Sequence, residues 1–326
     1  MAYASATYPG GTASVVTKTN ADKFVPEIWS DEIIASYKKR LVMANLVKKM
    51  PMKGKKGDLI HIPMPYRGSA YAKAAATAVT IQAQDESEKT VSLNKHYEYS
   101  RFIEDIVNVQ ALNSLRRHYT DDAGYALAKQ VDTDLIQLGR STNGGAGTAV
   151  YANAFIGGDG TTAYNSASTG NASSITDAAI RRTIQRLDDN DAPMDGRYLV
   201  VPPSSRNTLM GLARFTEQAF VGESGRSNTI RNGQIGDVYG VEVFVTSNCD
   251  AASVASGTAP KIALLFHKDT FVFAEQMGVR TQTQYKQEYL ADLLTADTLY
   301  GVQILRDSTD STAPNAATAF ALAVPA

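Results

Sequence analysis

Apolar residues recur at three- and four-residue steps between residues 103 and 138, which is the spacing of one face of an amphipathic helix. We expect a single long helix over about 105–139, ended by Gly139, because glycine is favoured just beyond a helix C-terminus. About 25 helical residues extend about 38 Å at 1.5 Å per residue, well beyond the usual helix of about 11–12 residues. The apolar face comprises Leu112, Leu115, Tyr119, Ala123, Ala126, Leu127, Val131, Leu135 and Leu138.

Two parts of the segment 57–100 instead alternate from one residue to the next, as a strand does, while residues 66–78 between them are small and weakly patterned. We expect a first strand at 59–63, ended by prolines, a short strand at 79–83, and a long strand at 89–100. Together they form a two-stranded excursion with little apolar surface of its own. Because a lone hairpin is marginal in water, this excursion needs another surface, such as another subunit, to rest on. One face of the last strand carries Val91, Leu93, Tyr97 and Tyr99.

Shorter elements follow the long helix. Residues 139–173 are rich in small and polar residues and predict a flexible connector. Thr176 then caps a helix whose apolar face is Ile180, Ile184 and Leu187. The run RYLVVPP, from residue 197, predicts a buried strand stopped by two prolines. The remaining expected elements are a helix at 204–213, a polar loop at 214–234, and strands at 236–247, 262–266, 271–273, 279–285 and 299–305.

The N-terminal region lacks a strong apolar pattern. Residues 1–23 are small and polar and predict a flexible arm. A helix is expected over about 31–40, where Ser30 or Asp31 can accept the first free backbone N–H groups. The chain after it is expected to cross other structure.

Composition limits the class of protein. The chain has 326 residues, of which 44% are apolar and 20% charged, so it can bury a core. Cys249 is the single cysteine, which excludes an internal disulfide framework and a cysteine-based zinc site. No apolar run approaches the roughly 20 residues of a membrane helix, and the N-terminus lacks the early basic region of a secretory signal. We therefore expect a soluble chain of intracellular origin with no membrane partner.

Charge is nearly balanced overall but unevenly spread. The net charge is -1, yet residues 1–100 carry 14 basic and 9 acidic side chains, and 38–57 contains eight Lys or Arg residues and no Asp or Glu. This segment is either a solvated basic face or a patch that faces a polyanion or an acidic partner. The candidate contact residues are Lys48, Lys49, Lys53, Lys55 and Lys56, with Asp85, Glu86 and Glu88 as the acidic counterpart at the hairpin tip.

Catalytic and metal-binding motifs are not evident. The four histidines form no HxxxH pair with an acid. The loops GGAGTA and GGDGTT lack the Gly-Lys-Ser/Thr ending of a phosphate loop, and GESGR fails the GxSxG pattern at its last position. The acidic residues at 188–195 lack the spacing of a calcium loop and indicate a turn. Cys249 has no basic cluster near it in sequence, which indicates a buried or idle thiol rather than a nucleophile. We expect no catalytic residue, cofactor or metal. A catalytic pair of carboxylates stays open, because such a pair needs no fixed spacing in the sequence.

Four stretches, in this order, resemble the major capsid protein of tailed double-stranded DNA bacteriophages, which has the Hong Kong 97-like fold. The first, FVPEIWSDEIIASYKKRLVMANLV, is similar to the family's N-terminal segment. KKGDLIHIPMPYRG with SLNKHYEYSRFIED is similar to the two legs of its extended loop. DAPMDGRYLVVPPSSRNTLM is similar to the entry of its axial domain, and YGVEVFVTSN with TADTLYGVQILRD to strands of its axial and peripheral domains.

The resemblance implies an α+β chain in five parts. These are an N-terminal arm and helix (1–56), an extended β-hairpin loop (57–100), a peripheral-domain spine helix with a flexible connector (101–174), an axial domain (175–260), and return strands with a C-terminal tail (261–326).

The resemblance also implies partners and a location. Hexamers and pentamers of the chain would form an icosahedral head around double-stranded DNA, held by non-specific contact. The implied partners are a portal protein and a decoration protein in some relatives. A separate scaffolding protein is expected because the capsid-like segments start within about 24 residues. Assembly would take place in the host bacterial cytoplasm. Lys73 and Lys89 lie in the loop, but no partner residue for a covalent crosslink is matched.

Two other functions stay open at this point. A nanocompartment shell protein that encloses an enzyme would share the fold but not the cargo. A soluble α+β hydrolase with scattered carboxylates would instead be a monomer or small oligomer with an apolar pocket.

Overall fold

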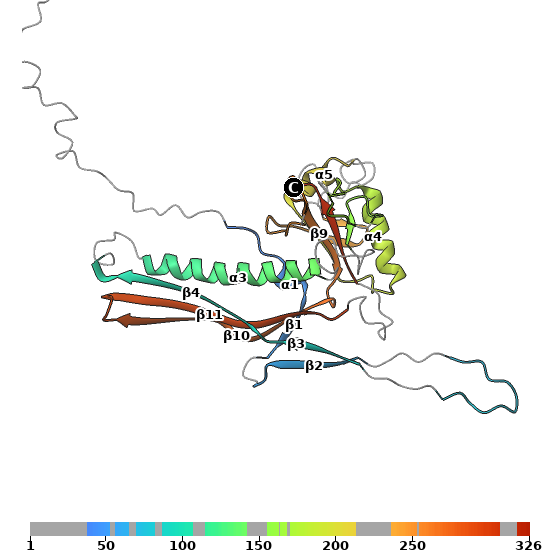
Figure 1. Ribbon diagram of the computed structural model, residues 1–326, viewed down its shortest axis with the longest axis horizontal. Helices are drawn as coiled ribbons and strands as arrows, with labels where there is room; N and C mark the ends of the chain where they lie inside the picture. Colours follow the sequence, from blue (N-terminus) through green and yellow to red (C-terminus); the bar gives the residue numbers. More distant parts are fainter. Residues whose placement is uncertain are drawn as a thin grey trace, which may run out of the picture.

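The computed structural model describes residues 38–52, 56–64, 70–81, 87–106, 115–141, 155–162, 164–167, 170–212, 236–252, 254–306 and 318–326. Figure 1 shows three parts: a long helix over a sheet, a more compact sheet with two helices at one end, and a hairpin that projects from the body.

The long helix α3 (Leu115–Ser141) covers one face of a four-stranded sheet (Figure 1). Ala123 and Leu127 of the helix are buried against Ala296, and Tyr97 and Tyr99 pack against the same cluster. The strand order is β1-β10-β11-β4, and β1 is parallel to β10 while the other pairs are antiparallel. The strands are β1 (Lys48–Pro51), β4 (Lys95–Glu104), β10 (Phe271–Lys286) and β11 (Ala291–Ile304).

The expected helix is confirmed over residues 115–139, and residues 105 and 106 are helical as well, but the predicted stop at Gly139 is wrong. Residues 103 and 104, which also fit the helical spacing, belong to β4, where Ile103 pairs with Asp292 of β11. At the other end, Gly139 lies inside α3. A Cβ atom at Gly139 would lie 2.6 Å from Cδ1 of the buried Leu264, so glycine permits close contact between the helix and the neighbouring strand.

The second sheet has six strands in the order β5-β12-β9-β6-β8-β7. Apolar side chains cover both of its faces, which explains why its strands read as continuous apolar runs rather than alternating ones. One face packs against helices α4 (Asp177–Asp189) and α5 (Pro203–Met210), and the other packs against the end of α3. The strands are β5 (Phe155–Gly157), β6 (Arg197–Val201), β7 (Asp237–Val238), β8 (Val241–Val245), β9 (Lys261–His267) and β12 (Ala319–Val324).

Several predictions for this second sheet are confirmed. The Oγ1 atom of Thr176 accepts the backbone N–H of Ala179 and caps α4, as expected. Leu187 on the predicted apolar face is fully buried. The strand after residue 197 and the helix after its two prolines are both present, with Pro203 at the first turn of α5, where its missing N–H costs no hydrogen bond.

Other predictions for the second half are corrected. The expected strands at 271–273 and 279–285 are one strand, β10, which bends at register shifts between Glu275 and Arg280. The connector expected at 139–173 contains the end of α3 and strand β5, which pairs with β12. The polar loop expected at 214–234 lies outside the described residues.

The hairpin is shorter than expected in its strands. Strand β2 (Leu59–Met64) pairs with β3 (Ser87–Ser92), whereas 95–104 leaves the hairpin to pair with β11 as β4. The predicted long strand is therefore split, because Tyr97 and Tyr99 pack against α3. The short strand expected at 79–83 is wrong at 79–81, which have no strand partner; the rest of it lies outside the described residues.

The N-terminal segment crosses the body as expected from residue 41, but without the predicted helix at 38–40. The earlier part of that helix, and the arm at 1–23, lie outside the described residues. A single helical turn, α1 (Met43–Leu46), buries Met43 and Leu46 and leads into β1.

Candidate functional site

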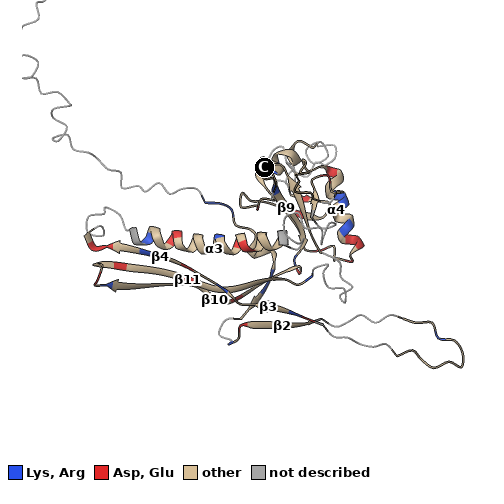
Figure 2. Ribbon diagram, viewed as in Figure 1, with Lys and Arg blue, Asp and Glu red and all other residues tan. Residues whose placement is uncertain are grey.

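The described outer part of the hairpin, residues 70–81, is exposed along its whole length. It carries one charge, Lys73, and is otherwise apolar or small (Figure 2). Tyr71, Val79 and Ile81 are 63%, 69% and 89% exposed. Covering exposed apolar side chains with a second surface lowers the free energy of the protein in water. This segment is therefore a candidate contact surface.

The base of the hairpin, by contrast, is packed on the body. Val91 and Leu93 are buried with Val272 and Ala274 of β10, and Ile60 packs against the same cluster. The backbone N–H of Leu93 also donates to the carbonyl oxygen of Asp58 at 2.8 Å. The hairpin is thus anchored at one end and without intramolecular cover at the other.

The structure places only some of the predicted charged contact residues. Lys48 and Lys49 lie exposed on the edge strand β1, and the Nζ of Lys49 donates to Oδ1 of Asn45 at 3.1 Å. Lys56 is exposed near the base of the hairpin. Glu88 lies in β3 and contacts the ring of His61 at 3.1 Å, so it does not meet Lys48 or Lys49 within the described chain. Lys53, Lys55, Asp85 and Glu86 lie outside the described residues.

The first part of the basic segment, residues 38–47, is held on α3 through its main chain. The sequence analysis did not predict this contact. The backbone N–H groups of Val42 and Met43 both donate to Oδ1 of Asp132, at 3.0 and 2.8 Å. Oδ2 of Asp132 accepts from Nδ2 of Asn248 at 2.9 Å. Asp132 is 1% exposed, and its only sequence signal is a carboxylate beside the apolar face of a helix. Closer to the exposed end of the segment, Tyr125 accepts the N–H of Lys39.

A second buried carboxylate fixes α3 on its sheet. Asp134 accepts from the hydroxyl of Tyr300 at 2.8 Å and lies 2.9 Å from Nζ of Lys95. Burial and the contact with Asp134 raise the pKa of Tyr300, which therefore stays a protonated donor. Because Lys95 is in β4 and Tyr300 in β11, the contact joins the helix to two strands, and its geometry suits a structural role.

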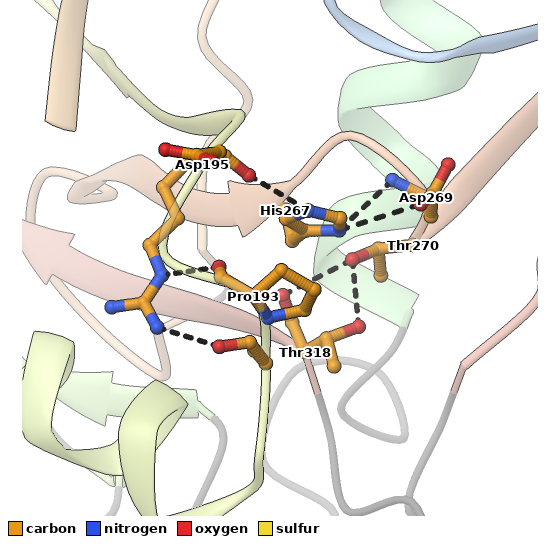
Figure 3. Close-up of polar contacts among 8 residues, drawn as sticks. Pro193, Asp195, His267, Asp269, Thr270 and Thr318 are labelled. Atoms are coloured by element: carbon orange, nitrogen blue, oxygen red, sulfur yellow. Dashed lines mark hydrogen bonds and ion pairs between the residues drawn. The ribbon is translucent and has the colours of Figure 1, made fainter.

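A polar junction lies where the two large sheets meet (Figure 3). His267 at the end of β9 contacts the carbonyl oxygen of Asp195 through Nε2, at 3.0 Å. Beside it, Arg197 donates to Oδ1 of Asp188 at 2.6 Å and to the carbonyl oxygen of Pro193 at 2.9 Å. His267 and Arg197 are 3% and 4% exposed, so both polar groups are satisfied inside the protein rather than in a cleft.

The loop GGDGTT does not present an empty phosphate cradle. The carboxylate of Asp159 accepts the backbone N–H groups of Thr161 and Thr162, at 3.0 and 3.2 Å, and the hydroxyl of Thr162 at 2.7 Å. Burial opposes the charge, but these hydrogen bonds lower the pKa of Asp159. The protein's own carboxylate therefore accepts two of the backbone N–H groups of this loop.

The remaining candidates for chemistry do not form a site in the described chain. Cys249 is buried, and burial raises its pKa to about 12, so the thiol is protonated and inert at neutral pH. No cluster of three or more His, Cys, Asp or Glu side chains within the described ranges has the geometry of a metal site. None of the helices in those ranges is long and apolar enough to span a membrane. The GESGR motif lies outside the described residues.

The chain was compared with known proteins. A family model described as phage capsid protein matches residues 89–302. No curated protein matches at the level of sequence.

Solved structures share the fold over nearly the whole chain. The capsid of Cyanophage P-SCSP1u has a TM-score of 0.71 at 15% identity and covers 98% of this chain and 99% of its own. A chain of Mycobacterium phage Che8 has a TM-score of 0.69 at 20% identity, with 92% and 97% covered. The capsid of Ralstonia phage GP4 has a TM-score of 0.66 at 13% identity, with 100% and 98% covered.

The family match spans more than half of the chain and includes α3, both large sheets in part and the polar junction. The chain therefore belongs to the phage capsid protein family: it is a structural major capsid protein of the virion with the Hong Kong 97-like fold, and it acts in a shell of many copies.

Proposed function

We propose that this chain forms hexamers and pentamers that close into an icosahedral head around double-stranded DNA. The observation that carries the proposal is the projecting hairpin, whose residues 70–81 are exposed and nearly uncharged while its base is packed on β10. A surface of this kind is stabilised when it lies across a neighbouring copy. Such a contact joins unlike surfaces of the two copies, and repeated around an axis it generates closed rings.

The parts of the fold suggest how the copies are arranged. We assign the six-stranded sheet with α4 and α5 to the axial domain, at the five- and sixfold axes. We assign α3 and the four-stranded sheet to the peripheral domain, and the β2–β3 hairpin to the extended loop. This differs from the expected boundaries mainly because β12, at the end of the chain, lies in the same sheet as β6 and β8.

Further partners belong to the same proposal. We propose a separate scaffolding protein and a portal protein during assembly in the bacterial cytoplasm, with a decoration protein as an optional addition. Membership in a structural capsid family favours a role without catalysis. No observation on the described residues favours an enzyme-filled compartment or a hydrolase over a head that holds DNA.

The basic segment supports a contact with the packaged nucleic acid. Five exposed basic residues lie in this segment, with no acidic residue between them in sequence: Lys38, Lys39, Arg40, Lys48 and Lys49. A surface of this composition attracts phosphate without reading bases. The alternative is that it faces acidic residues on the hairpin of a neighbouring copy, such as Glu88, which lies in β3 and not at the hairpin tip where the sequence analysis expected it.

Negative-stain microscopy of the expressed chain, with and without a scaffolding partner, tests the proposed assembly. Shells are expected in at least one condition, and small particles in all of them would contradict the proposal. Ile81→Asp should abolish shells while leaving the circular dichroism of the unassembled chain unchanged, because Ile81 is 89% exposed and makes no core. Ile81→Leu is the matched control and should assemble normally. Normal shells from Ile81→Asp would remove the hairpin as the contact surface.

Charge reversal at Lys53, Lys55 and Lys56 tests the role of the basic segment. Reduced particle yield is expected if the segment faces acidic residues on a neighbour's hairpin. Reduced genome retention is expected if it faces DNA. The matched control is the triple substitution Lys53→Arg, Lys55→Arg and Lys56→Arg, which keeps the positive charges. Normal packaged particles from the triple variant would exclude both contacts.

A further inference from the structure

The two large sheets are joined by a short turn that the chain crosses between β9 and β10. Strand β9 belongs to the six-stranded sheet and ends at His267; β10 belongs to the four-stranded sheet and begins at Phe271. The turn between them, residues 268–270, is therefore a direct covalent link between the two sheets.

Hydrogen bonds from four other strands or their flanks converge on this turn. The N–H of Lys268 donates to the carbonyl oxygen of Gly196, next to β6, at 3.0 Å, and the carbonyl oxygen of Lys268 accepts the N–H of Lys48 of β1 at 3.1 Å. The carbonyl oxygen of Thr270 accepts the N–H of Leu305, just after β11, at 2.8 Å. The hydroxyl of Thr270 meets that of Thr318, next to β12, at 2.7 Å. A change in the turn would thus reach both sheets.

His267 holds the turn through both ring nitrogens (Figure 3). Its Nδ1 accepts the backbone N–H of Asp269 at 3.3 Å, so Nδ1 carries no proton in this arrangement. The Nε2–H then donates to the carbonyl oxygen of Asp195 at 3.0 Å. The backbone N–H of His267 donates to the carbonyl oxygen of Thr318 at 3.1 Å. The observed geometry therefore requires the neutral imidazole with its proton on Nε2.

The charges that face His267 come from β6 and from the turn itself. Arg197 lies directly opposite it in the strand register and is held by Asp188, while Lys268 follows it in sequence. The carboxylate of Asp269 is 3.9 Å from Nδ1. Asp195 contributes its backbone carbonyl, and β12 contributes the uncharged Thr318. Burial lowers the pKa of His267, Lys268 and Arg197 act in the same direction, and Asp269 and the Asp195 carbonyl oppose them.

We propose that His267 makes this junction a proton-sensitive hinge between the two sheets. When solvent supplies a proton, it binds to Nδ1, the atom that accepts the N–H of Asp269 in the neutral state. Two donors then face each other, and the added positive charge lies beside Arg197. The turn relieves both conflicts by releasing the Asp269 N–H and moving the carboxylate of Asp269 toward the ring. The junction is closed with neutral His267 and loosened with the protonated form.

The inference goes beyond the proposed assembly and does not depend on it, because it concerns a junction within one copy. Hydrogen exchange of the full unassembled chain, followed by mass spectrometry, measures it. Peptides that cover 268–271 and 304–306 should exchange about tenfold faster at pH 5.5 than at pH 7.5, after correction for the intrinsic exchange rates. Peptides from the middle of α3 should show no comparable rise, since they do not contact the turn.

Variants that cannot titrate separate the histidine from other causes. His267→Gln keeps a donor near the position of Nε2, and His267→Asn keeps an acceptor near the position of Nδ1. Both should lose the pH dependence of exchange at the turn, while His118→Gln, a matched control elsewhere in the chain, should retain it. An equal rise in His267→Gln, or no rise in the wild-type chain, would overturn the inference.

If neither variant folds, the wild-type chain still decides the matter. In a nuclear magnetic resonance titration, the ring of His267 should titrate below the ordinary histidine value of about 6.5. The amide resonances of Asp269 and Leu305 should shift with the same midpoint. A ring that titrates at 6.5 or above, or amides that do not follow it, would refute the hinge.

Discussion

Asp132 should hold the N-terminal segment on the long helix, and its removal gives a test with a defined magnitude. The carboxylate accepts three donors: two backbone N–H groups, of Val42 and Met43, and the side-chain amide of Asn248. Asp132→Ala leaves the two backbone donors without an acceptor, in a region where Asp132 itself is 1% exposed, and leaves the amide of Asn248 with only the hydroxyl of Thr133. An unpaired buried donor costs about 1–3 kcal/mol, and a lost hydrogen bond about 1 kcal/mol. Even the lower bound gives about 2 kcal/mol for the two backbone donors, so the total is about 3 kcal/mol.

The size of this effect predicts an exchange rate. If the segment opens locally, a loss of about 3 kcal/mol corresponds to roughly a hundredfold rise in the open population, at about 1.4 kcal/mol per factor of ten. The amides of Val42 and Met43 should therefore exchange roughly a hundredfold faster in Asp132→Ala. Amides in the middle of β9, such as that of Leu264, should change much less because they do not open with the segment.

Two further variants isolate the hydrogen bonds from the change in side-chain volume. Asp132→Asn keeps an oxygen for the two backbone donors but turns an amide toward Nδ2 of Asn248, so it should cost about 1–3 kcal/mol. Adding Asn248→Asp exchanges donor and acceptor and should recover most of that loss. The reasoning is refuted if Asp132→Ala raises the exchange of Val42 and Met43 less than tenfold, or if the double variant is no more stable than Asp132→Asn alone.

Three other predictions follow from packing and burial. Gly139→Ala should destabilise the chain by about 1 kcal/mol, because overpacking against Leu264 outweighs the gain in helix propensity; Gly124→Ala, which meets no atom within 4 Å, should instead stabilise it by about 0.5–1 kcal/mol in urea unfolding. The thiol of Cys249, with its pKa raised to about 12, should react with iodoacetamide at pH 8 roughly a thousandfold slower in the folded chain than in urea, and similar rates would show that it is accessible. Thr176→Ala should lower thermal stability by about 1 kcal/mol through loss of the α4 cap, while Thr176→Ser should keep it, and equal losses in both variants would contradict the capping role.

The local parts of the fold could be predicted because their causes lie within a few residues. Thr176 caps α4 from three positions away, and two prolines end the strand that begins at Arg197. The body of α3 follows from its own periodic face. The C-terminal end of α3 could not be predicted, because Gly139 is placed by contact with Leu264, more than a hundred residues away in sequence.

The candidate sites also divide into those that the sequence predicts and those that depend on distant contacts. Exposure of the hairpin followed from the small, weakly patterned side chains between Ala70 and Ala78, which cannot form a core of their own. The acceptor role of Asp132 and the position of His267 depend on segments that meet only in the folded chain. A single carboxylate or histidine in a sequence carries no sign of the backbone N–H groups that will surround it, so neither could be selected in advance.

The place of β12 has a consequence for the order in which the chain is made and folds. Strand β12 lies between β5 and β9, and all six of its residues are buried. Strand β5 is at the edge of the sheet, and β12 is its one described partner strand. Residues 155–157 must wait for residues 319–324, which at about 5–20 residues per second are translated roughly 10–30 s later. Strand β9 is made about 50 residues before β12, so for roughly 3–10 s its apolar edge is open to wrong pairing and available to chaperones. A new subunit therefore has a complete six-stranded sheet, and can join the growing shell in its final fold, only after β12 has been inserted.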